Sequence, residues 1–231
     1  SNGTYSTSIP TATADGTYTV YYKVVGDSNH DDVSEASINV TINKAKLSIT
    51  ATGYSGTYDG NAHGITVTSS GATIKYGTSS GSYTLNASPT YTNVGTYTVY
   101  YQVTKAGYNT VTGNKTVTIT KANNTLKLSS NTGSYTYPTS GTFTVTENAS
   151  GGTLSCTSGN TNVATCSIDG TTVTVTPGTT EGTATLTIKS AATTNYNEGQ
   201  VAYVATTAKG LLSVTATGYS GTYDGNAHGI T

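Results

Sequence analysis

The chain repeats sixteen consecutive residues without a change: ATGYSGTYDGNAHGIT occupies 51–66 and again 216–231. The match extends upstream to 44 and 209, with three differences over the added residues. Internal repetition of this kind is the signature of a protein built from an array of modules. The second copy reaches the last residue of the sequence at a point where the first copy runs on. We therefore expect the sequence to be a window on a longer tandem array.

A shorter repeat identifies the unit that is reused. GTYTVYYKV at 16–24 returns as GTYTVYYQV at 95–103, and GTATLTI at 182–188 is a weaker relative. The first two copies are followed by a loop rich in polar residues and by a closing alternating segment, at 37–45 and 114–122. Two period-2 segments separated by turn residues predict an antiparallel hairpin.

The residue composition favours strands over helices throughout. The sequence has 27 Gly and 19 Tyr but no Met, no Trp and one Phe, Phe143. Thr, Val and Tyr fit the pleated surface of a strand, and TVTIT at 116–120 or TTVTVT at 171–176 alternates strictly between apolar and polar residues. Such strands bury one face and expose the other. The predicted fold class is all-β, with tandem immunoglobulin-like β-sandwich modules in a linear array.

The repeats predict four parts along the chain. Residues 1–43 correspond to the C-terminal part of a module and residues 44–122 to a complete one. Residues 123–208 form a complete module of a different type, and residues 209–231 the N-terminal part of a further copy. The end fragments are completed either by a longer natural chain or by strand exchange between head-to-tail copies. The sequence favours the longer chain, because nothing in the end fragments corresponds to 67–80.

Charge and hydropathy exclude several classes of function. The net charge is −1, and only 9% of the residues are charged, without a basic patch. Binding of nucleic acid through its phosphates is therefore not expected, and no segment reaches the length of a membrane span. The three histidines lie in predicted loops, and no nucleophile–base set or cofactor motif is visible. We expect no enzymatic activity and no cofactor.

Cys156 and Cys166 are separated by ten residues, with a turn-rich segment between them. The flanking segments are expected to pair as neighbouring strands, so that a disulfide could join them across a hairpin. The alternative is a pair of reduced cysteines that pack as small apolar residues. A metal site is disfavoured, because no further Cys pair or His lies at ligand spacing.

Three sets of polar residues are candidate sites. Asp59-Gly60 and Asp224-Gly225 match the preferred pair of a two-residue hairpin turn in which both residues have positive φ, and His63 and His228 are expected to be loop histidines. In GDSNHDD at 26–32, the carboxylates Asp27, Asp31 and Asp32 are a candidate Ca²⁺ site. The corresponding loop at 106–109 has no carboxylate, and the alternative is a solvated turn.

Residues 44–122 carry YDGNAH at 58–63, GTYTVYY at 95–101 and VTITKA at 117–122. This module resembles the MBG (mostly beta, glycine-rich; YDG-type) repeats of bacterial surface proteins, and residues 1–43 resemble their C-terminal part. Residues 123–208 resemble a bacterial Ig-like group 2 domain, through SGNTNVAT at 158–165 and GTA at 182–184. Cys156 stands near a position where that family usually has tryptophan, and Cys166 where it has valine. The joint change of two core positions to cysteine supports their pairing.

The resemblance implies an extracellular location at a cell or virion surface and a non-catalytic role as a stalk, fibre or adhesin segment. The expected partners are neighbouring modules of the same chain or head-to-tail copies. Two alternatives remain open, a glycan- or host-protein-binding adhesin module and a phage tail or virion fibre protein. Outward-facing tyrosines, one from each of the pairs at 21–22 and 100–101, could stack on sugar rings or could shield the sheet.

Overall fold

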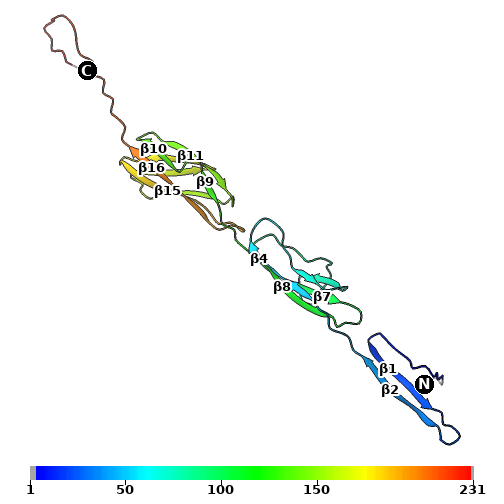
Figure 1. Ribbon diagram of the computed structural model, residues 1–231. Coiled ribbons are helices and arrows are strands. Elements are labelled where there is room, and N and C mark those ends of the chain that lie inside the picture. Colours follow the sequence, from blue (N-terminus) through cyan, green and yellow to red (C-terminus); the bar gives the residue numbers. More distant parts are fainter. Residues whose placement is uncertain (1–3, 230–231) are drawn as a thin grey trace. The chain divides into compact units, whose positions relative to one another are not determined.

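The computed structural model describes residues 4–229, which form strands and turns and contain no helix (Figure 1). They divide into two compact units, Ser1–Thr120 and Lys121–Thr231. The predicted fold class, all-β with tandem immunoglobulin-like sandwich modules, is confirmed. In this part of the chain no helix has the length and hydropathy needed to cross a bilayer.

The first unit begins with an antiparallel hairpin of β1 (Gly16–Val24) and β2 (Val33–Ile42). The register places Gly16 opposite Ile42 and Tyr18 opposite Val40. Because side chains alternate along a strand, Tyr18, Val20, Tyr22 and Val24 share one face of β1. This is the hairpin that the repeated GTYTVYY segment predicts.

The rest of the first unit is a module made of two sheets. Its strands are β3 (Thr50–Thr52), β4 (Tyr54–Thr57), β5 (Thr66–Thr68), β6 (Thr73–Gly77), β7 (Gly95–Thr104) and β8 (Val111–Thr120). β3 and β5 form one sheet, and the other has the order β4-β8-β7-β6. The β7–β8 pair is a second hairpin of the β1–β2 type, and β4 runs parallel to β8.

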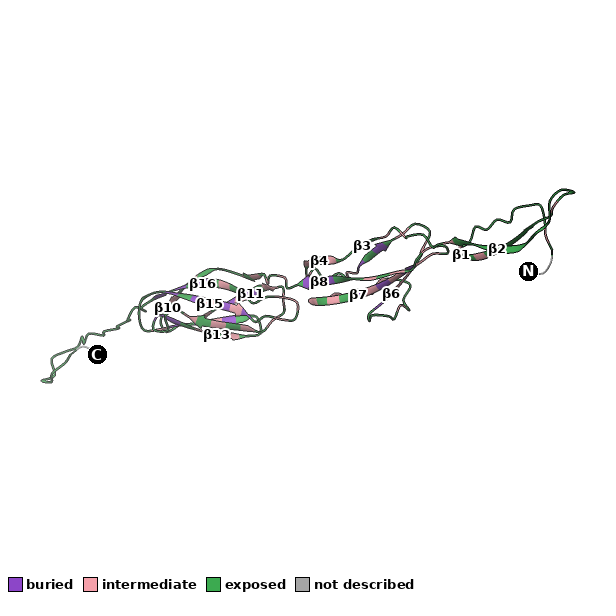
Figure 2. Cartoon of the chain, turned by 90° about the horizontal axis from the view of Figure 1, so that it is seen from below, coloured by how far each residue is buried: buried purple, intermediate pink, exposed green. Residues whose placement is uncertain are grey.

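The core of this module lies on one face of the β7–β8 hairpin. Val99, Val103 and Val117 are fully buried there, and Ile65 and Val67 pack against them. The strict alternation of GTYTVYYQV and TVTIT directs these side chains inward and the threonines outward. Figure 2 shows buried residues in this module, whereas β1 and β2 are coloured as exposed and intermediate.

Both modules open with the same backbone interaction. Ala45 makes two backbone hydrogen bonds, of 2.9 and 2.8 Å, with the 107–109 loop of its own module. Ala122 makes two bonds of 3.0 and 2.8 Å with the 195–197 loop in the same manner. Lys121 and Ala122 belong to the second of the two compact units.

The second unit is a sandwich of two four-stranded sheets. Its strands are β9 (Leu126–Leu128), β10 (Thr132–Thr136), β11 (Gly141–Asn148), β12 (Leu154–Ser158), β13 (Ala164–Asp169), β14 (Thr172–Pro177), β15 (Gly182–Ser190) and β16 (Gly199–Ala208). One sheet has the order β10-β16-β15-β12 and the other β13-β14-β11-β9. β10 pairs in parallel with the last strand, β16, as β4 does with β8.

The inward faces of both sheets form the core of this sandwich. Leu186 and Ile188 of β15 and Val173 and Val175 of β14 are completely buried between the sheets. After β16, residues 209–229 form no strand, and their side chains are exposed.

Candidate functional site

The structure joins Cys156 and Cys166 in a disulfide, with their Cα atoms 6.1 Å apart. Cys156 lies on β12 and Cys166 on β13, which are edge strands of opposite sheets. The expectation that these segments pair as neighbours in one hairpin is therefore wrong. Residues 159–163 instead carry the chain from one sheet to the other, so the disulfide connects the two layers of the sandwich. Both cysteines are half-buried against the core.

The sequence Asp59-Gly60 does not form the predicted hairpin turn. Gly60 has a φ of +81°, but no described residue other than glycine has a positive φ, so Asp59 does not. β4 ends at Thr57 and pairs with β8 rather than with the strand that follows it. Asp59 Oδ1 instead accepts a hydrogen bond of 2.9 Å from the backbone N–H of Asn61. This local side-chain bond shapes the turn.

His63 lies beside this turn and completes a cluster with Asp59 and Tyr54. Its Nε2 is 3.0 Å from Asp59 Oδ1, and its ring stacks on the Tyr54 ring with centroids 3.8 Å apart and planes 9° apart. The hydrogen bond from His63, followed by those from Asn61, lowers the pKa of Asp59 to about 2. The backbone of His63 also exchanges two hydrogen bonds of 2.9 Å with Tyr91. His63 is therefore a loop histidine with a defined structural role.

The second copy of the motif forms the same cluster. His228 Nε2 is 2.8 Å from Asp224 Oδ1, and its ring stacks on Tyr219 at 3.6 Å. The same hydrogen bond lowers the pKa of Asp224. Residues 209–229 belong to no strand, so the cluster forms from its own ten-residue segment. No residue-type motif predicts this Tyr–Asp–His cluster, and the only signal for it in the sequence is the unchanged spacing of the three residues in both copies.

The cluster depends on a glycine under the tyrosine ring. A Cβ added at Gly56 would lie 2.8 Å from Tyr54 Cζ, and one at Gly221 would lie 2.6 Å from Tyr219 Cζ. Side-chain atoms do not normally approach so closely, so a larger residue would displace the ring. The glycine therefore allows the tyrosine side chain to fold over the backbone two residues downstream and reach the histidine.

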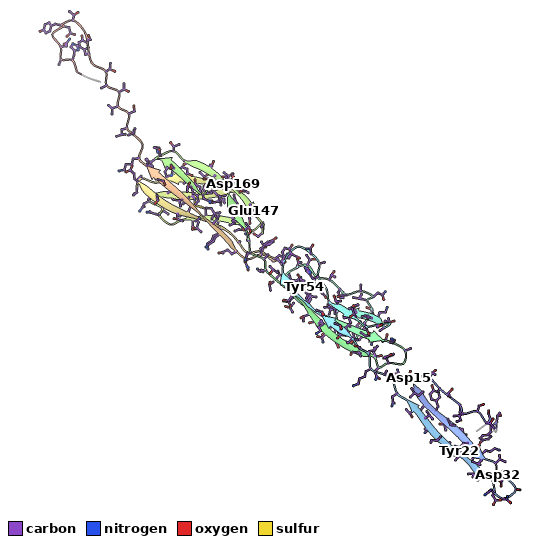
Figure 3. The ribbon with its side chains drawn as sticks, in the orientation of Figure 1. Asp15, Tyr22, Asp32, Tyr54, Glu147 and Asp169 are labelled. Carbon is purple, nitrogen blue, oxygen red and sulfur yellow. A yellow bond between two sulfur atoms is a disulfide. The ribbon has the colours of Figure 1, made fainter. Side chains whose placement is uncertain are left out.

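The three carboxylates of the candidate Ca²⁺ site do not form a ligand set. Asp32 lies in the loop that joins β1 to β2 (Figure 3), where its Oδ1 accepts a hydrogen bond of 2.7 Å from Gly26 N. Asp27 Oδ1 instead bonds with Asn29 N and His30 Nδ1. Within residues 4–229, no three His, Cys, Asp or Glu side chains are arranged to hold a metal ion. Asp31 therefore belongs to no such group. Donors of the loop itself occupy Asp27 and Asp32.

The paired tyrosines take two different environments. On β7, Tyr101 is buried in the core and Tyr100 is half-buried on the outer face, as alternation predicts. On β1, both Tyr21 and Tyr22 are about half exposed. The outer face of each hairpin therefore presents one tyrosine ring, but the inner face of the β1–β2 hairpin is also accessible.

No protein-family model and no curated protein sequence match this chain. Among solved structures, domains 4 and 5 of the S-layer protein SbsC are 21% identical over 71% of this chain and 98% of that one, with a TM-score of 0.35. A structure of SbsC domains 1–6 is 18% identical, with a TM-score of 0.38, and the match spans 37% of its length. The titin domains Z1Z2, solved with telethonin, are 7% identical over 72% of this chain and 99% of that one, with a TM-score of 0.39. TM-scores below 0.5 leave these likenesses too loose to assign a function.

Proposed function

We propose that this chain is a structural, non-catalytic repeat segment of an extracellular stalk, fibre or adhesin that projects or polymerises at a cell surface. The observation that carries the proposal is the Cys156–Cys166 disulfide, which connects the two sheets of one sandwich within a tandem array. Disulfides persist in oxidising surroundings such as the cell exterior. Repeated sandwiches, one of them cross-linked between its sheets, suit a structural role at such a site.

The polar clusters of both units support a non-catalytic role. Asp59 and His63 bond to each other within a turn, and the buried Ser190 hydroxyl donates to Asn148 Oδ1 at 2.9 Å. Among the described residues, no buried side-chain nitrogen or oxygen lacks a hydrogen-bond partner. These groups are engaged in holding the fold, which is what a structural module requires.

The sequence resemblance supports the same proposal. Residues 44–122 carry the YDG-type motif and residues 123–208 the SGNTNVAT motif, so we propose that they are an MBG-like module and a bacterial Ig-like group 2 module. The partners proposed for them are neighbouring modules of the same chain and other copies of it.

The location can be tested on intact cells that naturally produce the chain. A membrane-impermeant amine reagent should label exposed lysines such as Lys115 before the cells are lysed. A cytoplasmic protein from the same cells serves as the control and should be labelled only after lysis. Labelling of this chain only after lysis would contradict an extracellular role.

Recognition of a glycan or a host protein is a second candidate, favoured by the exposed outer ring of Tyr21. Aromatic faces stack on sugar rings, and Tyr21 is about half exposed on the outer face of the β1–β2 hairpin. A glycan array should then show binding that Tyr21→Ser removes and Thr19→Ser retains. If the unaltered chain bound no glycan on the array, the structural role would be the one proposed function that remains.

A further inference from the structure

The hairpins β1–β2 and β7–β8 share one register from Gly16 to Tyr22 and from Gly95 to Tyr101. Gly16 pairs with Ile42 as Gly95 pairs with Ile119, and Tyr18 pairs with Val40 as Tyr97 pairs with Val117. The local hydrogen bonding is also the same. The Tyr18 hydroxyl donates to the carbonyl four residues upstream at 3.0 Å, and the Tyr97 hydroxyl does so at 3.1 Å.

The inner faces of the two hairpins nevertheless differ greatly in exposure. Val103 and Val117 are 0% exposed, whereas the corresponding Val24 and Val40 are 54% and 46% exposed. A cavity of about 450 Å³ opens beside β1, lined on one side by Tyr18, Val20 and Val40 and otherwise mostly by the chain's own residues within 4–12, which cover this face only in part. An apolar face of this kind marks an interaction site.

The first module shows what covers such a face. Residues 44–66 lie on the β7–β8 hairpin, with β4 parallel to β8 and Tyr54 opposite Val117. The approach is close at Gly53, where an added Cβ would lie 2.5 Å from the Thr116 carbonyl oxygen. Glycine at this position therefore permits the contact between the segment and the hairpin.

The described residues contain a second copy of this covering segment that covers nothing. In residues 209–229, Leu212 is 95% exposed, whereas the corresponding Leu47 packs against the core of the first module. The Tyr219–Asp224–His228 cluster is already formed in this uncovered segment. A segment whose turn is formed in advance loses less conformational freedom on binding.

We propose that residues 209–229 of one copy of this chain bind the inner face of the β1–β2 hairpin of a second copy. The internal module fixes the register: the segment pairs in parallel with β2, with Tyr219 opposite Val40 and Ser220 opposite Thr41. Backbone hydrogen bonds of the added strand and burial of Val40 against Tyr219 stabilise the complex. Residues 209–229 supply no counterpart of β6, the strand that pairs with β7 in the internal module.

The two surfaces lie on different parts of the chain, so the interface is heterologous. A heterologous contact that does not close into a ring continues from copy to copy and forms a filament. The inference names a partner for the proposed structural role and rests on that role. A chain that failed to associate would overturn this inference and leave the structural role intact.

The first experiment uses Gly218, the counterpart of Gly53. A Cβ at Gly218 meets nothing within 4 Å, and its φ is not in the left-handed region, so Gly218→Val is compatible with the uncomplexed fold. In the proposed complex the same side chain would strike the backbone of β2. Ser220→Val adds comparable bulk in the same segment, at a position whose counterpart, Ser55, points to solvent.

Sedimentation velocity over a hundredfold range of concentration reads out the result. The unaltered chain and Ser220→Val should rise above the monomer mass of 23.5 kDa with concentration, and Gly218→Val should remain monomeric. Equal association of both variants would overturn the proposed contact. If the unaltered chain remained monomeric at every concentration, the proposed association between copies would be overturned. The inner face of the β1–β2 hairpin would then have to bind something other than a second copy.

A second experiment tests the register and tests whether residues 209–229 bind a second copy rather than their own chain. Chains carrying Thr41→Cys are mixed with chains carrying Ser220→Cys, and mild oxidation should give a covalent heterodimer. Ser37→Cys in place of Thr41→Cys is the control, because it lies four residues, or about 13 Å, away along β2. No heterodimer, or equal yields with the control, would overturn the register. A doubly substituted chain that cross-links only within itself would overturn binding between copies.

Discussion

The hydroxyl groups of Tyr135 on β10 and Tyr203 on β16 lie 2.6 Å apart and share a hydrogen bond. Tyr203 is almost fully buried, and its ring stacks at 3.9 Å on Phe143 of the opposite sheet. Burial of the Tyr135 hydroxyl, together with this hydrogen bond, raises the pKa of Tyr135. This hydrogen bond adds to the backbone pairing between β10 and β16 a side-chain contact between the edge strand and the core.

Replacement of one of these tyrosines should lower the free energy of unfolding by more than the net contribution of the hydrogen bond between them. Tyr203→Phe leaves the Tyr135 hydroxyl without its partner, and we expect a loss of about 1–2 kcal/mol in the free energy of unfolding. The double variant Tyr135→Phe with Tyr203→Phe removes both polar groups and should be destabilised by less than the sum of the single changes. Urea unfolding of the four proteins measures the coupling. Strict additivity would show that the hydroxyl contact contributes no coupling energy.

Loss of the disulfide should destabilise the second unit alone. The bridge closes a loop of ten residues, and its removal in Cys156→Ala with Cys166→Ala should lower the free energy of unfolding by about 2–3 kcal/mol. Separate domains unfold nearly independently, so calorimetry should show one transition moving to lower temperature and one unchanged.

The control for this change is chemical reduction. A reducing agent should shift the same transition in the unaltered chain and should have no effect on the double alanine variant. A shift of both transitions, or of neither, would contradict a stabilising cross-link confined to the second unit.

Alternation along the sequence was sufficient to predict the strands and their inward faces. GTYTVYY at 95–101 and TVTIT at 116–120 place Val99 and Val117 inward, and both are fully buried. Alternation says nothing of which strand lies next to which, because any register that keeps the faces satisfies it. The parallel pairing of β4 with β8 was therefore not predicted, nor was the position of Cys156 and Cys166 on opposite sheets.

The polar cluster could be predicted less well than the strands. Asp-Gly favours a hairpin turn, but here the Asp59 side chain bonds to Asn61 and His63, and this local bonding decides the conformation. The stacking of His63 on Tyr54 spans nine residues and requires a strand, a glycine and a turn to act together. A rule based on the turn preference of Asp-Gly alone therefore does not predict the stacking of His63 on Tyr54.

Acid titration should reveal the interaction of Asp59 with His63. The pKa of Asp59 falls from an ordinary 3.8 to about 2 in the folded chain. A depressed folded pKa contributes stability that is present above pH 3.8 and is lost as the pH falls toward 2. NMR titration of the side-chain carboxyl should give a midpoint near 2, and the first unit should lose stability over that range.

A variant separates the hydrogen bond from the stacking. His63→Phe retains an aromatic ring against Tyr54 but removes the Nε2 partner, so the pKa of Asp59 should rise toward 3.8. Asp224, whose partner His228 is unchanged, is the internal control and should keep its lowered pKa. An Asp59 midpoint that did not move would show that His63 is not the main cause of the shift.

The two hairpins allow one substitution to be compared in two environments. Val103 and Val24 occupy the same position of the repeat, yet Val103 is fully buried and Val24 is largely exposed. Val103→Ala removes two buried methyl groups and should lower the free energy of unfolding by about 2 kcal/mol, because each buried carbon contributes roughly 0.8 kcal/mol. Val24→Ala should change it by less than about 0.5 kcal/mol when measured in dilute solution. Similar losses for the two variants would mean that the inner face of the β1–β2 hairpin is covered in the free chain, even though the pairing shifts by one residue between Tyr22 and Val24 and is regular through Val103.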